Sequence, residues 1–148
     1  MRGSMDNGGD FPLEPIERDT AAPLQLALSI VAPHGLSIAS GRKTIEVRSW
    51  RPDHLPLRNL LIVENDSFLT EENQADPNGR AVALVDIEDV HAWEPSELAA
   101  ACSNRWAPGY WAWRIANVRP LAVIAPVVAR RRLYRVETNP EFLNRPVS

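Results

Sequence analysis

Residues 41–50 read GRKTIEVRSW, and this stretch joins an expected turn to an expected charged strand. It carries four charged side chains, and Lys43 is the only lysine among the 16 basic residues of the chain. The alternation of apolar and polar residues over 43–50 predicts a β-strand. Gly41 can end a preceding helix in the left-handed conformation, so the stretch predicts a helix-to-strand junction.

The residues on either side predict further short elements. An apolar strand is expected over 24–31, and Pro33 opens a short helix over 34–40. Downstream, Pro52 and Pro56 bracket a turn, and a polar stretch over 64–79 predicts a surface loop. The remaining expected elements are strands at 57–63, 80–90, 110–118, 121–128 and 131–136, and a helix at 96–102 that begins after Pro95.

These six or seven strands and two short helices favour one fold class. No expected helix is long enough for a crossover between parallel strands, so layered α/β architectures are disfavoured. We therefore expect a mainly β (α+β) fold: a small antiparallel or mixed β-barrel of about six strands with two or three short helices.

Composition is typical of a single globular domain, with 148 residues that are 45% hydrophobic and 24% charged. Residues 1–23 open with MRGSM, which is typical of a vector leader, and are rich in Gly, Pro, Asp and Glu, so we expect disorder there. We expect the domain over 24–137 and a C-terminal tail over 138–148.

The net charge of −3 is concentrated outside the expected domain, because residues 24–137 hold 13 basic and 13 acidic side chains. A neutral domain disfavours strong non-specific binding of long nucleic acids. Basic residues nevertheless cluster within 17 positions and can form a local cleft: Arg42, Lys43, Arg48, Arg51 and Arg58.

Several classes of protein are disfavoured by the sequence. There is no apolar run long enough to span a bilayer and no visible signal peptide, so a cytoplasmic protein is predicted. Cys102 is the only cysteine and is expected to be buried and inert, and the three histidines show no metal-binding spacing. No metal and no cofactor are expected, and a monomer is assumed.

The stretch 41–50 also resembles a known motif, G-x-K-x-x-E-x-R, present here as Gly41, Lys43, Glu46 and Arg48 and followed by Ser49 and Trp50. With the preceding strand and proline-initiated helix, it resembles the ASCH domain, a branch of the PUA-like β-barrels. The resemblance extends over about 24–137, because YWAW at 110–113 resembles the late aromatic strand of the family and RLYRV at 132–136 resembles its closing strand. One departure is His34, since many members carry Trp or Tyr after the proline.

The resemblance implies a role with RNA. Proposed roles in the family are RNA binding, ribonuclease activity and, in one small branch, hydrolysis of N4-acylated cytidines. That branch carries threonine where this chain has Glu46, so its mechanism does not transfer intact. We therefore expect a cleft that binds single-stranded RNA or a nucleotide or nucleoside, with hydrolysis as the enzymatic version; a non-catalytic RNA-binding module and a protein-interaction domain are the alternatives.

Three residues are the catalytic candidates: Lys43, Thr44 and Glu46. On a strand, Thr44, Glu46 and Arg48 share one face, and Glu46 and Arg48 lie about 7 Å apart along it. A neutral Lys43 amine could accept a proton from water or from the Thr44 hydroxyl, which Glu46 would hold or relay. The alternatives are a structural Glu46–Arg48 ion pair and a Lys43 that contacts an anion as a point charge.

The binding candidates are Arg42, Arg48, Trp50, Trp111, Trp113 and His34. Trp111 and Trp113 share a strand face and could stack a base, although the core is favoured for at least one of them. Trp50 is expected at the pocket rim. His34 could contact a ligand, and a surface histidine is the alternative. The run Arg130–Arg132 could bind phosphate, but solvated residues at a strand start are favoured.

Overall fold

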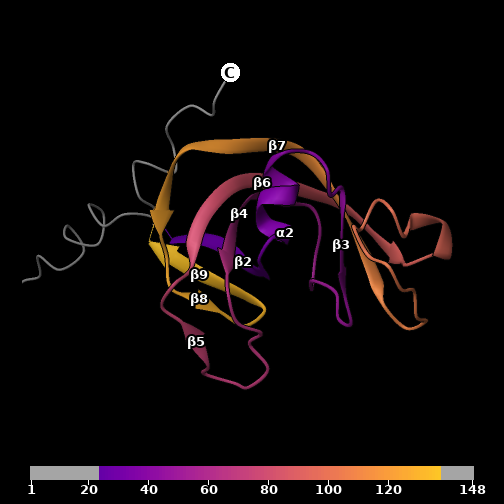
Figure 1. Ribbon diagram of the computed structural model, residues 1–148, viewed down its shortest axis with the longest axis horizontal. Helices are drawn as coiled ribbons and strands as arrows, with labels where there is room; N and C mark the ends of the chain where they lie inside the picture. The colour runs from indigo at the N-terminus through magenta and orange to yellow at the C-terminus, as the bar shows by residue number, and fades with distance from the viewer. Residues whose placement is uncertain (1–23, 138–148) are drawn as a thin grey trace, which may run out of the picture.

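The computed structural model describes residues 24–137, which form a mainly β fold with a single short α-helix (Figure 1). The expected leader, disordered segment and C-terminal tail lie outside the described residues. None of the helices in residues 24–137 has the length and apolar character needed to cross a membrane. The elements are β2 (Leu24–Val31), α2 (His34–Ala39), β3 (Ile45–Arg48), β4 (Leu57–Asn65), β5 (Ala75–Asp76), β6 (Arg80–Ala92), the 3-10 turn η1 (Pro95–Glu97), β7 (Trp111–Pro126), β8 (Ala129–Arg130) and β9 (Leu133–Glu137).

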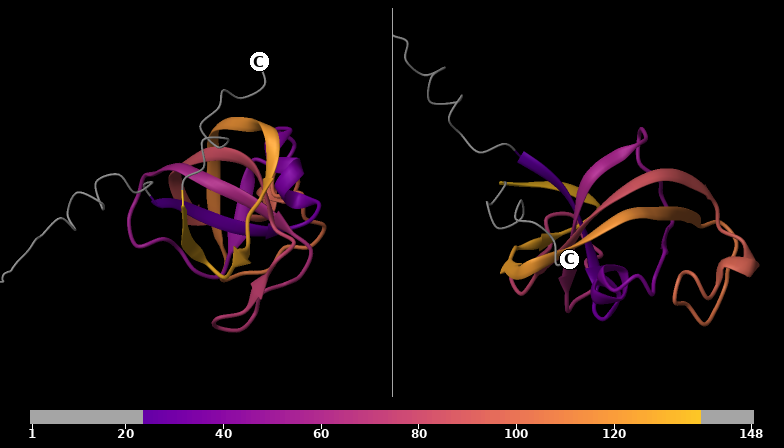
Figure 2. Two further views of the ribbon diagram at one scale, coloured as in Figure 1. Left: turned by 90° about the vertical axis from the view of Figure 1, so that its left-hand side faces the viewer. Right: turned by 90° about the horizontal axis from the view of Figure 1, so that it is seen from above.

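Six of these strands form one mixed sheet in the order β3-β7-β6-β4-β2-β9. Strands β2 and β4 are parallel, and the other neighbours pair antiparallel. Strands β5 and β8 form a separate two-stranded sheet. The long strands β6 and β7 arch over the molecule and curve the sheet (Figure 2). The predicted class, a small barrel-like fold of about six strands, is confirmed.

The late part of the chain differs from the expectation in one respect. The predicted strands at 110–118 and 121–128 are one continuous strand, β7, which pairs with β6 along its length. Pro120 lies opposite Ala83, beside a register shift in the pairing. Proline cannot donate to a strand ladder, but it is tolerated where a bulge breaks the ladder, so β7 continues through it.

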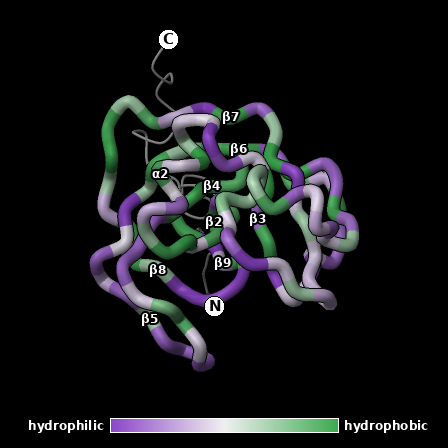
Figure 3. Tube along the Cα trace, turned by 45° about the vertical axis from the view of Figure 1, so that its right-hand side comes forward, coloured by the Kyte–Doolittle hydropathy of each residue, from purple (hydrophilic) through white to green (hydrophobic). Residues whose placement is uncertain are grey.

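The core lies between the curved strands and the helix. Its largest buried members include Leu28, Leu60, Ile62 and Trp113, and the last is fully buried. Figure 3 shows apolar residues gathered along the central strands and hydrophilic ones along the loop that carries β5. Full burial of a side chain of this size contributes about 1.5–3 kcal/mol, so this cluster holds the strands that position the motif.

Helix α2 confirms the short helix expected before the motif. The helix starts after Pro33. Gly41 follows the helix with a φ of 84°, and the Gly41 N–H donates to the Ile38 carbonyl. The start of the helix is capped from a distant strand, because the Leu36 N–H donates to Glu64 Oε2 at 2.9 Å. Both ends of the helix are therefore fixed, and the chain passes from Gly41 directly into the motif.

The predicted helix over 96–102 is wrong in extent. Only Pro95–Glu97 are helical, as a 3-10 turn with a capping box between Glu94 and Glu97. Residues 98–102 continue as turns, and Cys102 closes them with a φ of 55° in the left-handed region. A non-glycine residue in that conformation ends helical hydrogen bonding. The segment therefore turns back toward the motif.

The remaining predicted boundaries shift by a few residues. Strand β3 is shorter than the expected strand at 43–50, β4 runs two residues further, and β9 begins two residues later than expected. The expected loop over 64–79 contains the two-residue strand β5.

Candidate functional site

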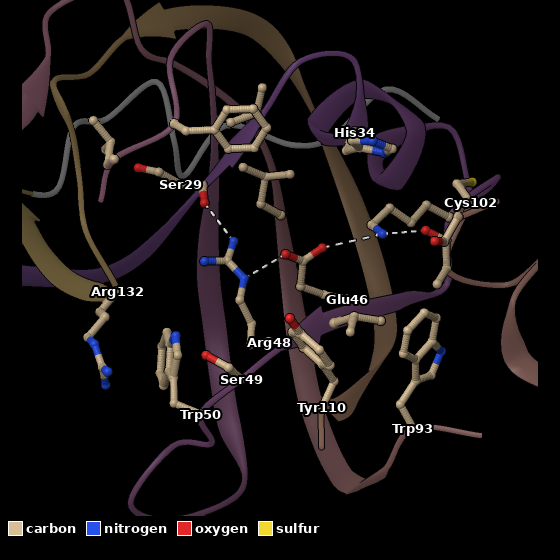
Figure 4. A pocket seen from close by; sticks show the side chains of 18 of the residues that line it. Ser29, His34, Glu46, Arg48, Ser49, Trp50, Trp93, Cys102, Tyr110 and Arg132 are labelled. Carbon is tan, nitrogen blue, oxygen red and sulfur yellow. Dashed lines mark hydrogen bonds and ion pairs between the residues drawn. The ribbon is translucent and has the colours of Figure 1, made fainter. Parts of the chain in front are cut away.

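A cavity of about 940 Å³ opens beside the motif, between the start of α2, strand β3 and three loops. The loops follow β4, precede β7 and join β8 to β9. Figure 4 shows motif side chains in the centre of this cavity, with Trp50 and Arg132 on one side and Trp93 and Cys102 on the other. Segments separated by about a hundred residues in sequence therefore meet around GRKTIEVRSW.

Three motif side chains form a continuous polar chain on the cavity wall. Lys43 Nζ lies 3.4 Å from Glu46 Oε1, and Arg48 Nε donates to Glu46 Oε2 at 2.7 Å. Lys43 is 5% exposed and Glu46 is 7% exposed. The sequence left a structural Glu46–Arg48 ion pair and a functional cleft as alternatives, and the geometry combines them: this pair is partly buried and also lines the cavity.

Main-chain carbonyls hold both ends of this chain. Lys43 Nζ donates to the Ala101 carbonyl at 2.6 Å, and Arg48 donates to the Ser29 carbonyl at 2.8 Å. Buried charges need such partners, because water no longer solvates them. Lys43 thus ties the segment after η1 to the motif, and Arg48 ties β3 to β2.

Charge around the cavity is strongly unbalanced. Among the lining residues that the structure describes, Glu46 is the single carboxylate, and it is already paired with Lys43 and Arg48. The cations that line the cavity are Lys43, Arg48, Arg105, Arg130, Arg131 and Arg132. The site therefore attracts anions, although residues 24–137 are neutral as a whole.

Aromatic rings line the same cavity. Trp50 was expected at the rim and does line it, and Phe68, Trp93 and Tyr110 join it. Phe68 is 75% exposed, the highest value among the large exposed hydrophobic residues of the described chain. Sequence reasoning missed Phe68, Trp93, Tyr110 and Arg105. A signal existed for Phe68, which is a lone aromatic residue in an otherwise polar loop.

Four predicted site residues do not line this cavity: Arg42, Thr44, Trp111 and Trp113. Thr44 is exposed and lines a second cavity, because it precedes β3 and does not share the face of Glu46. Trp113 is fully buried, so it cannot stack a ligand. Trp111 is covered by Arg51, whose guanidinium carbon lies 4.6 Å from the ring centroid.

His34, Cys102 and Arg130–Arg132 also lie along the cavity. His34 lines the cavity, and its Nδ1 is buried without a hydrogen-bond partner among the described residues. Cys102 is half-buried and lines the cavity, so the expectation of a buried cysteine is wrong. Arg130–Arg132 also line the cavity, and Arg130 and Arg132 are exposed, so the expected solvated arginines border the cavity.

The second cavity, of about 650 Å³, is lined by His91, which lies between two carboxylates. His91 Nε2 lies 2.6 Å from Glu97 and Nδ1 lies 2.7 Å from Asp89. The hydrogen bonds to Glu97 and, secondarily, to Asp89 raise the pKa of His91 above its usual value. Within residues 24–137, no group of three or more His, Cys, Asp or Glu side chains has an arrangement that could hold a metal ion.

Comparison with known proteins identifies the family. The family model described as "ASCH domain" matches residues 28–125, which is more than half of the chain. A crystal structure of a ZmASCH mutant protein from Zymomonas mobilis is similar at 15% identity with a TM-score of 0.41, covering 70% of this chain and 74% of that chain. No curated protein matches the sequence. The chain belongs to the ASCH domain family.

Proposed function

We propose that the cavity beside the motif binds a nucleotide, a nucleoside or a segment of single-stranded RNA. The observation that carries this proposal is the charge of the lining: of its six cations, two pair with the single carboxylate Glu46, and the other four do not. Arginine-rich sites suit phosphate, because the guanidinium donates from a planar fork that matches two phosphate oxygens.

The rings support the nucleic-acid part of the proposal. Trp50, Phe68 and Tyr110 line the cavity together with the arginines, and base stacking on aromatic side chains is the common means of recognising unpaired bases. A cavity of about 940 Å³ is also within the size range of small-molecule sites. A duplex would instead need a broad basic surface, and residues 24–137 carry equal numbers of basic and acidic residues.

Binding is tested by titrating matched single- and double-stranded oligonucleotides and a mononucleotide at physiological salt. We expect the single strand to bind more tightly than the duplex. Arg131→Ala should weaken binding and lower the salt slope by about 1, as for one lost phosphate contact. Arg135→Ala is the matched control, because Arg135 is exposed on β9 and does not line the cavity. Tighter duplex binding would reject the proposal.

Hydrolysis is a second candidate function, favoured by the position of the Lys43–Glu46 pair at the cavity wall. In this candidate Lys43 would act as a neutral amine, and Glu46, 3.4 Å away, is the group that would hold or relay its proton. That amine can take a proton from a water molecule attacking the bound ligand, in the manner of a general base. Lys43 would then serve both the structure and the chemistry.

Lys43→Arg tests this candidate, because arginine keeps the charge but does not lose its proton at ordinary pH. Labelled single-stranded RNA and N4-acetylcytidine are the substrates, read by gel and by chromatography. A general base predicts a loss of turnover of about 10²-fold or more with little change in affinity. Turnover retained in a folded Lys43→Arg protein would leave a binding module.

A further inference from the structure

The Trp50 ring packs against the ring of a buried neighbour, Trp113. The ring centroids of Trp50 and Trp113 lie 5.0 Å apart at an interplanar angle of 87°, so the two rings meet edge to face. The Trp113 indole N–H also donates to the Trp50 carbonyl at 3.3 Å. Because Trp113 is fully buried, Trp50 is anchored to the core although it lines the cavity.

Trp50 also contacts an arginine across its ring. Arg132 places its guanidinium carbon 4.8 Å from the Trp50 ring centroid, and both residues line the cavity. Figure 4 shows the two side chains next to each other at one side of the site. Arg132 is exposed, so a ligand can displace its guanidinium more easily than the anchored Trp50 ring.

The backbone that carries Arg132 is itself anchored. Arg132 lies between β8 and β9 with a φ of 56°. The Arg130 N–H donates to the Ser29 hydroxyl at 3.2 Å, and β8 pairs with β5. The long side chain can therefore swing while its Cα stays in place, which keeps the guanidinium near Trp50 before and after a ligand enters.

We infer that the contact between Trp50 and Arg132 opens to form the base-binding subsite of the cleft, where a nucleobase stacks between the indole and the guanidinium. This inference rests on the proposed binding function and specifies the ligand: a planar base joined to a phosphate, in preference to a sugar phosphate alone. A stacked plane needs about 3.5 Å on each side, so the guanidinium moves outward by about 2–3 Å. The neighbouring arginines stay available to the phosphate.

The chain contains a matched contact away from the cavity. Arg51 lies over the ring of Trp111 at 4.6 Å, almost the same distance as in the Trp50 pair, but neither residue lines the cavity. Substitutions of Arg132 and Arg51 therefore remove the same kind of interaction. Only the first is expected to change ligand recognition.

The experiment compares adenosine 5′-monophosphate with ribose 5-phosphate, whose affinities differ by the contribution of the base. We expect the wild-type protein to prefer the nucleotide by about 5- to 150-fold, the range of one stacked base. Arg132→Lys keeps the charge but loses the flat guanidinium, so the preference should fall several-fold while ribose 5-phosphate affinity changes less than about twofold. Arg51→Lys should leave the preference unchanged.

A spectroscopic readout reports on Trp50 directly. The chain has five tryptophans, and the indole N–H signal of Trp50 in a ¹H–¹⁵N spectrum is assigned as the one missing from Trp50→Phe. The nucleotide should shift this signal more than ribose 5-phosphate does. Equal affinities for the two ligands, an unshifted Trp50 signal, or equal effects of Arg132→Lys and Arg51→Lys would overturn the subsite and leave the proposed binding function standing. Failure of both ligands and of single-stranded RNA to bind would overturn both proposals.

Discussion

Replacing Glu46 with glutamine tests how the buried charge chain stabilises the fold. Glu46→Gln keeps the shape of the side chain but removes the charge that Lys43 and Arg48 share, at 3.4 Å and 2.7 Å. Two cations would then remain, one of them 5% exposed, without a carboxylate among their contacts. We expect a marked loss of stability.

The magnitude follows from the burial and the remaining partners. Removing one member of a buried ion pair costs about 3–5 kcal/mol, because it leaves an uncompensated buried charge. Lys43 keeps the Ala101 carbonyl and Arg48 keeps the Ser29 carbonyl, so the lower end of that range, about 3 kcal/mol, applies. For a domain of this size, such a loss lowers the Tm by roughly 10–15 °C.

Urea unfolding followed by tryptophan fluorescence measures this difference. Glu88→Gln is the matched control, because Glu88 pairs with Arg58 but is about half exposed, and such surface pairs contribute about 1 kcal/mol or less. The double variant Lys43→Met with Glu46→Gln should recover part of the lost stability, since it removes the buried cation as well. If Glu46→Gln costs no more than Glu88→Gln, the reasoning from burial is wrong.

Two further predictions concern packing and pH. Gly79→Ala should destabilise the fold by about 1–3 kcal/mol and lower the Tm. The added Cβ would lie 2.2 Å from the Val127 carbonyl oxygen, a backbone atom that cannot rotate away. An unchanged Tm would contradict this close packing. Hydrogen bonds to Glu97 and Asp89 raise the folded-state pKa of His91. The protonated imidazole therefore stabilises the fold by about 1 kcal/mol. This contribution is fully present below the unfolded pKa of about 6.5 and is lost as the pH rises through the higher folded-state pKa. The difference in free energy of unfolding between wild type and His91→Gln should therefore shrink from pH 6 to pH 9. A difference that grows over this range would refute a stabilising role for the two hydrogen bonds of His91.

Local patterns in the sequence predicted most of the strands correctly. Apolar segments gave β2, β4 and β6, and Pro33 and Gly41 bracketed α2, because backbone constraints of proline and glycine act over a few residues. The same local reasoning split β7 at Pro120 and extended η1 into a helix. Both errors arose where pairing with a distant strand, or a left-handed residue, overrode the local pattern.

The motif itself was readable from the sequence, including the resemblance to the ASCH domain and the lone lysine. The sequence could not say that Lys43 is buried against Ala101 and Glu46, or that Thr44 lies at a different cavity. Those facts depend on how the chain leaves α2, since Lys43 and Thr44 lie between the helix and β3, where simple strand alternation does not hold.

The sequence alone thus determined the strand-rich class and the charged motif, because residue spacing and turn residues act locally. Only the tertiary structure decided what surrounds the motif: Phe68, Arg105 and Arg132 reach the cavity from three different loops. Curvature of the sheet and pairing between distant strands bring those loops together. The excess of positive charge in the cavity is consequently a property of the folded chain, since residues 24–137 are neutral in sum and folding brings six of their cations to this one cavity.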